Sequence, residues 1–133
     1  MLSAERRRAL KQRLAGRQPV FGGWTSIGHP SITEILCGAR VDFIGIDLEH
    51  STISQEQSQR IIAASQAVGV ACLPRVASHN KEMIARLLDS GADGIIVPMV
   101  PDGDTAARIG SWCRYPPDGM RSFGVARAHG YGG

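Results

Sequence analysis

The stretch VDFIGID, residues 41–47, is a dense apolar run that ends in an acid. Such a run is typical of a buried strand in a parallel sheet, where both faces of the strand are covered. A second run of the same kind, GIIVPMV, covers residues 94–100. Each run follows shortly after a glycine, Gly38 or Gly91, and glycine commonly ends a helix. The sequence therefore predicts buried strands that are preceded by helices.

The same order of helix, glycine and strand repeats along the chain. Residues 31–34 (SITE) and 54–57 (SQEQ) have the spacing of capping boxes, and Asn80 and Asp102 or Asp104 are further expected helix caps. This regularity indicates βαβ units, in which crossover helices lie over a parallel sheet. Strands are expected to begin near residues 20, 41, 70, 94 and 122.

Periodicity alone leaves two α/β architectures open. Five β-α units would fit a small doubly wound sheet of the flavodoxin type. A closed eight-stranded barrel needs roughly 200 or more residues, so a length of 133 favours the open sheet. The same length suits one domain, residues 1–133, and is too short for two.

Composition narrows the class of protein. Apolar residues make up 43% and charged residues 20%, as in soluble globular proteins. No apolar run approaches the roughly 18 residues of a membrane span, and the N-terminus lacks the apolar core of a secretory signal, so a cytoplasmic location is expected. Three widely spaced cysteines without a CxxC pair argue against a disulfide framework and against a structural zinc site.

The net charge of +3 is concentrated near the N-terminus. One interpretation is an arm that binds nucleic acid. The other is a solvated helix face, with Leu10 and Leu14 docking on the opposite side. The second is favoured, and no nucleic-acid partner is expected, because no aromatic residues lie between the basic ones. The basic residues are Arg6, Arg7, Arg8, Lys11, Arg13 and Arg17.

Polar side chains follow the expected strands at their carboxyl ends, where ligands bind in both architectures. Trp24 ends the first strand, Asp47, Glu49 and His50 follow the second, and Arg75 ends the third. Ordinary structural roles are open to three of them: a solvated loop for His50, a turn cap for Asp47, an ion pair for Glu49. Arg75 needs an anionic partner, because it ends a buried strand. We therefore expect a reaction site at this edge.

Three stretches resemble the N-terminal half of the HpcH/HpaI aldolases. They are IGIDLEHSTIS (residues 44–54), LPRV followed by LLDSGADGIIVPMV (residues 73–76 and 87–100), and RYPPDGMRSFG (residues 114–124). The stretches are short, but their order and spacing make a specific match that extends over nearly the whole chain.

The resemblance implies a (β/α)8 barrel of the TIM type, truncated here to about the first four to five β-α units. It implies a metal-dependent (class II) pyruvate aldolase that reversibly cleaves a 4-hydroxy-2-oxo acid to pyruvate and an aldehyde through an enolate. The divalent cofactor would be Mg or Mn, or Co in some members. The family's motifs place the catalytic base on His50, the enolate-stabilising group on Arg75, and an aspartate that raises the basicity of the histidine on Asp89. Substrate-binding or supporting positions would fall on Trp24, Asp47 and Glu49.

Enolate formation requires a positioned base and a partner for the oxyanion, which suits a histidine and an arginine. A Schiff-base route is disfavoured, because the two lysines, Lys11 and Lys81, lie at expected helix positions. The family's metal-ligating carboxylates lie beyond Gly133, so no metal ligand is expected within this chain. An inactive truncated barrel and a flavodoxin-like binding domain therefore stay open as alternatives. The expected partners are a small oxo acid, an aldehyde and further copies of the chain, with no membrane.

Overall fold

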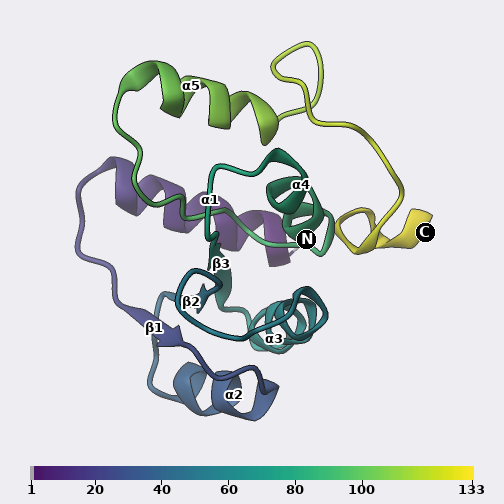
Figure 1. Cartoon of the computed structure of the whole chain (residues 1–133). Coiled ribbons are helices and arrows are strands. Elements are labelled where there is room, and N and C mark those ends of the chain that lie inside the picture. Colours follow the sequence, from purple (N-terminus) through teal and green to yellow (C-terminus); the bar gives the residue numbers. More distant parts are fainter. Residues whose placement is uncertain (1) are drawn as a thin grey trace.

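The structure, a computed structural model, describes residues 2–133. Helices and strands alternate over the first three strands (Figure 1). Within the described chain, no helix combines the length and the apolar character that crossing a membrane requires. The elements are α1 Leu2–Ala15, β1 Gly22–Thr25, α2 Pro30–Gly38, β2 Phe43–Asp47, α3 Gln55–Ala67, β3 Ala71–Arg75, α4 Lys81–Asp89, α5 Gly103–Trp112 and the 3-10 segment η1 Arg127–Gly132.

The three strands form one parallel sheet in the order β1-β2-β3. Its register pairs Trp24 with Gly45 and Asp47 with Arg75. Neighbouring strands of a barrel follow one another in chain order, whereas the flavodoxin-type order is not sequential. The predicted parallel α/β arrangement is confirmed, and the flavodoxin-like alternative is not favoured.

The side chains of β2 point alternately to the two faces of the sheet, and their burial shows which face the helices cover. Ile44 and Ile46 are fully buried and belong to a core cluster with Ile61 and Ile62 of α3. Residues of the opposite parity in a strand point to the other face of the sheet. Figure 1 shows α2, α3 and α4 following one another around one side of the strands. The face that would line the interior of a barrel therefore carries none of these helices.

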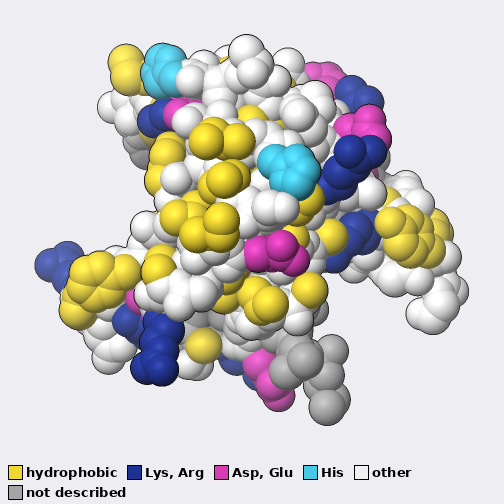
Figure 2. All heavy atoms as spheres, turned by 90° about the horizontal axis from the view of Figure 1, so that it is seen from below, with side chains coloured by type: hydrophobic (Ala, Val, Ile, Leu, Met, Phe, Trp, Pro, Cys, Tyr) yellow, Lys and Arg dark blue, Asp and Glu magenta, His cyan; other side chains and the backbone are white. Residues whose placement is uncertain are grey.

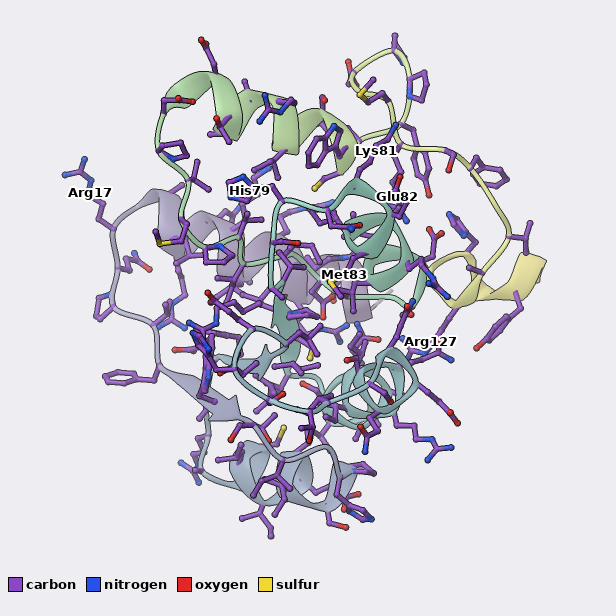
Figure 3. The ribbon with its side chains drawn as sticks, viewed as in Figure 1. Arg17, His79, Lys81, Glu82, Met83 and Arg127 are labelled. Carbon is purple, nitrogen blue, oxygen red and sulfur yellow. The ribbon has the colours of Figure 1, made fainter. Side chains whose placement is uncertain are left out.

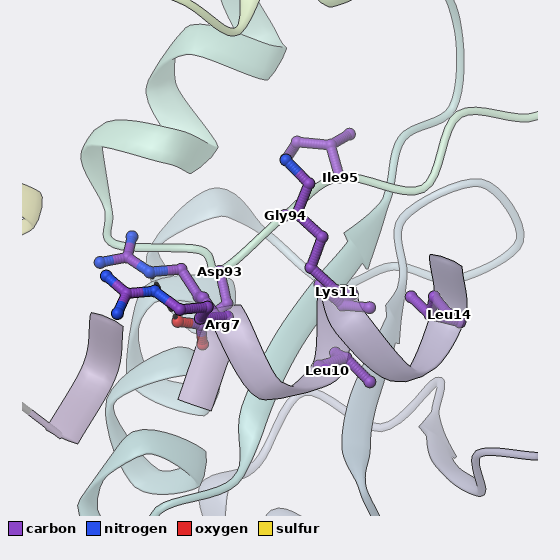
Figure 4. A pocket seen from close by; sticks show the side chains of 9 residues that line it. Arg7, Leu10, Lys11, Leu14, Asp93, Gly94 and Ile95 are labelled. Carbon is purple, nitrogen blue, oxygen red and sulfur yellow. Dashed lines mark ion pairs between the residues drawn. The ribbon is translucent and has the colours of Figure 1, made fainter. Parts of the chain in front are cut away.

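Helix α1 lies across the amino ends of the strands. Arg13 forms an ion pair with Asp42, just before β2, and Arg6 forms one with Asp93, just before the fourth strand position. A cavity of about 570 Å³ separates α1 from the inner face, and Leu14 lines it, half exposed (Figure 4). The basic helix is thus used partly for structural ion pairs rather than being only a solvated face.

The predicted fourth strand, residues 94–100, forms only in part. It pairs with β3 through a single parallel bridge at Ile96. The Ile96 N–H donates to the Pro74 carbonyl at 2.8 Å, and the Ile96 carbonyl accepts from Val76 at 3.0 Å. Pro98 has no N–H that could extend this ladder. No strand among residues 2–133 pairs with the edge of residues 94–100 that faces away from β3. The prediction of a strand over the whole of residues 94–100 is therefore wrong in its extent.

The predicted fifth strand near residue 122 is wrong. Residues 119–126 contain no strand. The backbone N–H of Met120 donates to the Ser111 carbonyl, and that of Arg121 donates to the Arg114 carbonyl. This segment is therefore hydrogen-bonded to the end of α5 and to the turn that follows it. Local hydrogen bonds have replaced the pairing with a sheet edge.

The helix caps are predicted correctly at three of four places. Ser54 forms a full capping box, and Asn80 and Asp102 each accept from a backbone N–H of the first turn. The box expected at residues 31–34 is wrong, because α2 begins at Pro30 and its cap is His29. A proline at the first helical position has no N–H to satisfy, which moves the cap one residue before it.

We expect the isolated chain to self-associate. The inner face and the outer edge of residues 94–100 are uncovered, and large side chains such as Phe21, Ile35 and Met99 are 70% exposed or more. Figure 2 shows hydrophobic side chains gathered on the side of the molecule that carries α2. Exposed apolar patches and open strand edges favour association. Sedimentation velocity at several concentrations measures this, and a monodisperse, cooperatively melting monomer would contradict it.

Candidate reaction site at the strand carboxyl ends

Arg75 is the centre of an ion-pair cluster at the carboxyl ends of β2 and β3. Its Nη2 donates to Asp47 Oδ2 at 2.8 Å, and its Nε donates to Asp47 Oδ1 at 3.3 Å. Glu49 adds a second carboxylate, with Oε2 at 3.4 Å from Arg75 Nε. The Arg75 side chain is a quarter exposed, and its Nη1 has no hydrogen-bond partner within residues 2–133. One end of the guanidinium therefore remains available to an anionic ligand.

Asp47 is held as a carboxylate at the end of β2. Its Oδ1 accepts from the backbone N–H groups of Glu49 and His50, at 3.0 Å each. Desolvation by burial acts to raise the pKa of Asp47, but the hydrogen bonds from His50, Arg75 and Glu49 outweigh it and lower the pKa to about 2. The turn that carries Glu49 and His50 is thereby tied to the strand.

The lowered pKa of Asp47 predicts a dependence of stability on pH. A carboxyl whose folded pKa is about 2, against 3.8 unfolded, adds about 2 kcal/mol of stability. This contribution is complete above about pH 5 and is lost as the pH falls towards the folded pKa. Urea unfolding of wild type and Asp47→Asn should therefore differ most at neutral pH and converge near pH 2. A difference that stays constant from pH 7 to pH 2 would show that Asp47 is not responsible.

Glu49 lies between Arg75 and His50. Its Oε2 faces Arg75, and its Oε1 is 3.6 Å from His50 Nε2. The His50 side chain is 72% exposed, so the imidazole is open to solvent and to a ligand. The carboxylate nearest to the imidazole is thus the adjacent Glu49, at a distance that a modest movement would close to a hydrogen bond.

Trp24 reaches across β2 towards Arg75. Its ring centroid lies 5.0 Å from the Arg75 guanidinium carbon, within the range of a cation–π contact. The ring crosses Gly45, where a Cβ would lie 2.3 Å from a ring carbon. Gly45 is a position that sequence reasoning missed. A glycine inside the apolar stretch 41–47 was the available signal, because strand glycines often mark a close approach.

Within this chain the structure places Asp89 away from His50, and the expected pairing between them stays a prediction. Helix α4 runs back from the carboxyl ends of the strands, so its last residue, Asp89, lies towards their amino ends. There Asp89 Oδ1 accepts from Arg121 Nη2 at 2.6 Å. The remaining predicted residues, Trp24, Asp47, Glu49, His50 and Arg75, do lie in one cluster.

A divalent metal does not fit the side chains of this cluster. Among the described residues, no group of three or more His, Cys, Asp or Glu side chains is placed to hold a metal ion. Asp47 and Glu49 both face the Arg75 guanidinium, whose positive charge would oppose a cation at the same oxygens. The group of this cluster that can take an anion is the unpaired end of the Arg75 guanidinium.

Comparison with known proteins gives a consistent family. Residues 21–129 match the family described as HpcH/HpaI aldolase/citrate lyase. The chain is 34% identical to a 4-hydroxy-2-oxovalerate aldolase of Rhodococcus jostii (strain RHA1), over 93% of this chain and 48% of that protein. It is 36% identical to a hydroxypyruvate/pyruvate aldolase of Paraburkholderia phytofirmans, over 92% of this chain and 50% of that protein.

Comparison with solved structures gives the same family. A protein of the HpcH/HpaI aldolase/citrate lyase family from Burkholderia cenocepacia J2315 superposes with a TM-score of 0.86 at 32% identity, over 93% of this chain and 51% of that one. The chain therefore spans about half the length of the relatives it matches.

Proposed function

Because the chain belongs to the HpcH/HpaI aldolase/citrate lyase family, we propose that the protein carrying it is a metal-dependent pyruvate aldolase. The reaction is the reversible cleavage of a 4-hydroxy-2-oxo acid to pyruvate and an aldehyde. The proposal includes a closed (β/α)8 barrel for the whole protein, of which this chain supplies the first units, and assembly into a homo-oligomer. Relatives named as aldolases of hydroxy-oxo acids and of pyruvate support this reaction class.

The observation that carries the proposal is the pairing of a fixed guanidinium with an accessible imidazole at one strand edge. Arg75 is oriented by two contacts to Asp47 and retains a free Nη1, while His50 stands beside Glu49 and is open to solvent. In the synthetic direction, an imidazole nitrogen of His50 takes a proton from C3 of pyruvate. The electron pair of that C–H bond forms the enolate, whose charge develops on the C2 oxygen. Arg75 stabilises that charge.

Each supporting side chain has a definite task in this proposal. Asp47 fixes the position of the Arg75 guanidinium and, through its backbone hydrogen bonds, the turn that carries His50. Glu49 lies 3.6 Å from His50 Nε2, where its carboxylate can form an ion pair with the imidazolium once His50 has taken the proton. Trp24 covers Arg75 and limits the space beside the enolate.

Metal dependence is proposed on the family alone. A divalent ion would polarise the oxygens of pyruvate. Since the described side chains do not fit a metal site, we assign no metal ligand within this chain.

The experiment that tests the function is deuterium exchange at C3 of pyruvate, followed by proton NMR. Exchange isolates enolate formation from the unknown aldehyde, and it is run with and without Mg²⁺ or Mn²⁺. We expect metal-dependent exchange above the rate in buffer. Exchange at the buffer rate in the protein that carries this chain would exclude the proposed reaction.

Replacing Arg75 by lysine is expected to slow this exchange by about 10²-fold. Lysine keeps the charge but loses the planar fork that binds Asp47 and an oxyanion at the same time. The matched control is Arg60→Lys, on the exposed side of α3, where the arginine pairs with Glu56. Equal exchange rates in Arg75→Lys and Arg60→Lys would remove Arg75 from the mechanism.

A further inference from the structure

A cavity on the outer side of α4 lies away from the reaction site. Its volume is about 390 Å³, and it is bounded by one face of α4, the end of α5 and the segment that follows Arg121. Figure 3 labels Lys81 and Glu82 at the start of this face. The lining residues are Lys81, Glu82, Ala85, Arg86, Asp89, Trp112, Arg121 and Ser122.

Arg121 is a buried cation with incomplete hydrogen bonding. Its side chain is only 9% exposed, and it comes from the RYPPDGMR stretch to which the proposed function assigns no role. Nη2 donates to Asp89, and the guanidinium carbon lies 4.6 Å from the Tyr115 ring centroid. Nε is buried without a hydrogen-bond partner among residues 2–133. Buried charged groups are normally fully paired. Arg121 lines the cavity with its charge incompletely compensated, so an anion bound there would be stabilised by the guanidinium.

The charges around the cavity point the same way. Lys81 and Arg86, five residues apart on α4, both line the cavity and form no ion pair with the described residues. With Arg121 they place three cations against the carboxylates of Glu82 and Asp89, and Asp89 is already bound to Arg121. The field inside the cavity therefore favours negative charge.

The other residues that line the cavity indicate which further features the ligand should have. Trp112 and Ala85 give the wall an apolar part, and Ser122 adds a hydroxyl beside Arg121. Pockets that combine an apolar wall with a few convergent polar groups are typical of small-molecule sites. An inorganic ion alone would leave the indole wall without a partner.

We propose that this cavity binds a small organic anion, with one carboxylate or phosphate group held by Lys81, Arg86 and Arg121 and an apolar part against Trp112. The site is separate from the Arg75 cluster, because it lies on the outer face of α4 whereas Arg75 ends β3. The proposal does not depend on the aldolase reaction. Binding and enolate formation can therefore fail independently.

The chain's two tryptophans allow both sites to be followed in one experiment. Trp24 reports the reaction site and Trp112 reports this cavity, through their indole N–H signals in a proton–nitrogen correlation spectrum. Benzoate and inorganic phosphate are titrated at constant ionic strength, so that an organic carboxylate is compared with a simple anion. We expect a saturable shift of the Trp112 signal with benzoate, with a dissociation constant on the order of 1 mM, and a weaker response to phosphate.

The paired variant Lys81→Gln/Arg86→Gln should weaken benzoate binding at least about tenfold, since each lost charge-assisted hydrogen bond costs that much or more. Arg8→Gln/Lys11→Gln is the matched control: it removes the same charge from α1 and should leave the Trp112 titration unchanged. Saturable binding lost only in the α4 variant supports the site. An unsaturated Trp112 response, or equal weakening in both variants, overturns it, because general charge attraction then explains the shifts.

Discussion

Replacing His50 by alanine is expected to reduce deuterium exchange at C3 of pyruvate by about 10²-fold or more, the usual effect of losing a general base. The expectation follows from the position of His50. Among residues 2–133 it is the histidine that contacts the Arg75 cluster, and its imidazole is 72% exposed next to the Glu49 carboxylate. The other three histidines serve elsewhere: His29 caps α2, His79 contacts the Pro98 carbonyl, and His129 contacts Tyr115.

The control for His50 removes an imidazole without touching the cluster. His129→Ala deletes a ring that contacts Tyr115 near the carboxyl end of the chain, and it should leave exchange at the wild-type rate. Glu49→Gln keeps the shape beside His50 and removes the carboxylate that would pair with the imidazolium formed in the reaction, so exchange should slow. Wild-type exchange in His50→Ala would remove the histidine from the mechanism and, with it, the proposed enolate step.

Replacing Asp93 by alanine is expected to lower the free energy of unfolding by about 3–5 kcal/mol, the usual cost of removing one partner of a buried ion pair. The Asp93 side chain is 1% exposed. It accepts from Arg6 Nη2 at 3.3 Å, from Gln66 Nε2 at 3.0 Å and from the Cys72 backbone N–H at 2.9 Å. Alanine would leave the Cys72 N–H without this acceptor and Arg6, 8% exposed, without its counter-charge, while Gln66 Nε2 would keep its hydrogen bond to the Gly91 carbonyl.

Asp93 also joins parts of the chain that are far apart in sequence. Through Arg6 it holds α1, through Cys72 it holds β3, and through Gln66 it reaches α3 and then Arg127 of η1, whose Nη1 lies 2.7 Å from Gln66 Oε1. Urea unfolding followed by circular dichroism, at one fixed protein concentration, measures the loss. Asp118→Ala, at an exposed loop position, is the control and should stay within about 0.5 kcal/mol of wild type. Equal losses in the two variants would show that the Asp93 network does not stabilise the fold.

The sequence by itself predicted the repeat of helices and strands and the edge at which the polar residues gather. Both follow from local rules. Apolar runs such as residues 41–47 become buried strands, Ser54, Asn80 and Asp102 cap the helices that follow, and parallel strands bring their carboxyl ends to one edge. The clustering of Asp47 with Arg75 follows from that geometry, because the two residues end neighbouring strands in register.

The tertiary structure decided the contacts that depend on direction and distance across the chain. Asp89 falls at the far end of α4 and pairs with Arg121, because a crossover helix returns to the amino ends of the strands. Glu49 is therefore the carboxylate beside His50. Trp24 can contact Arg75 only because Gly45 leaves room for the ring. The stretch 94–100 has the composition of a buried strand, but it forms only one bridge with β3, because pairing between two segments is not encoded in the composition of one of them.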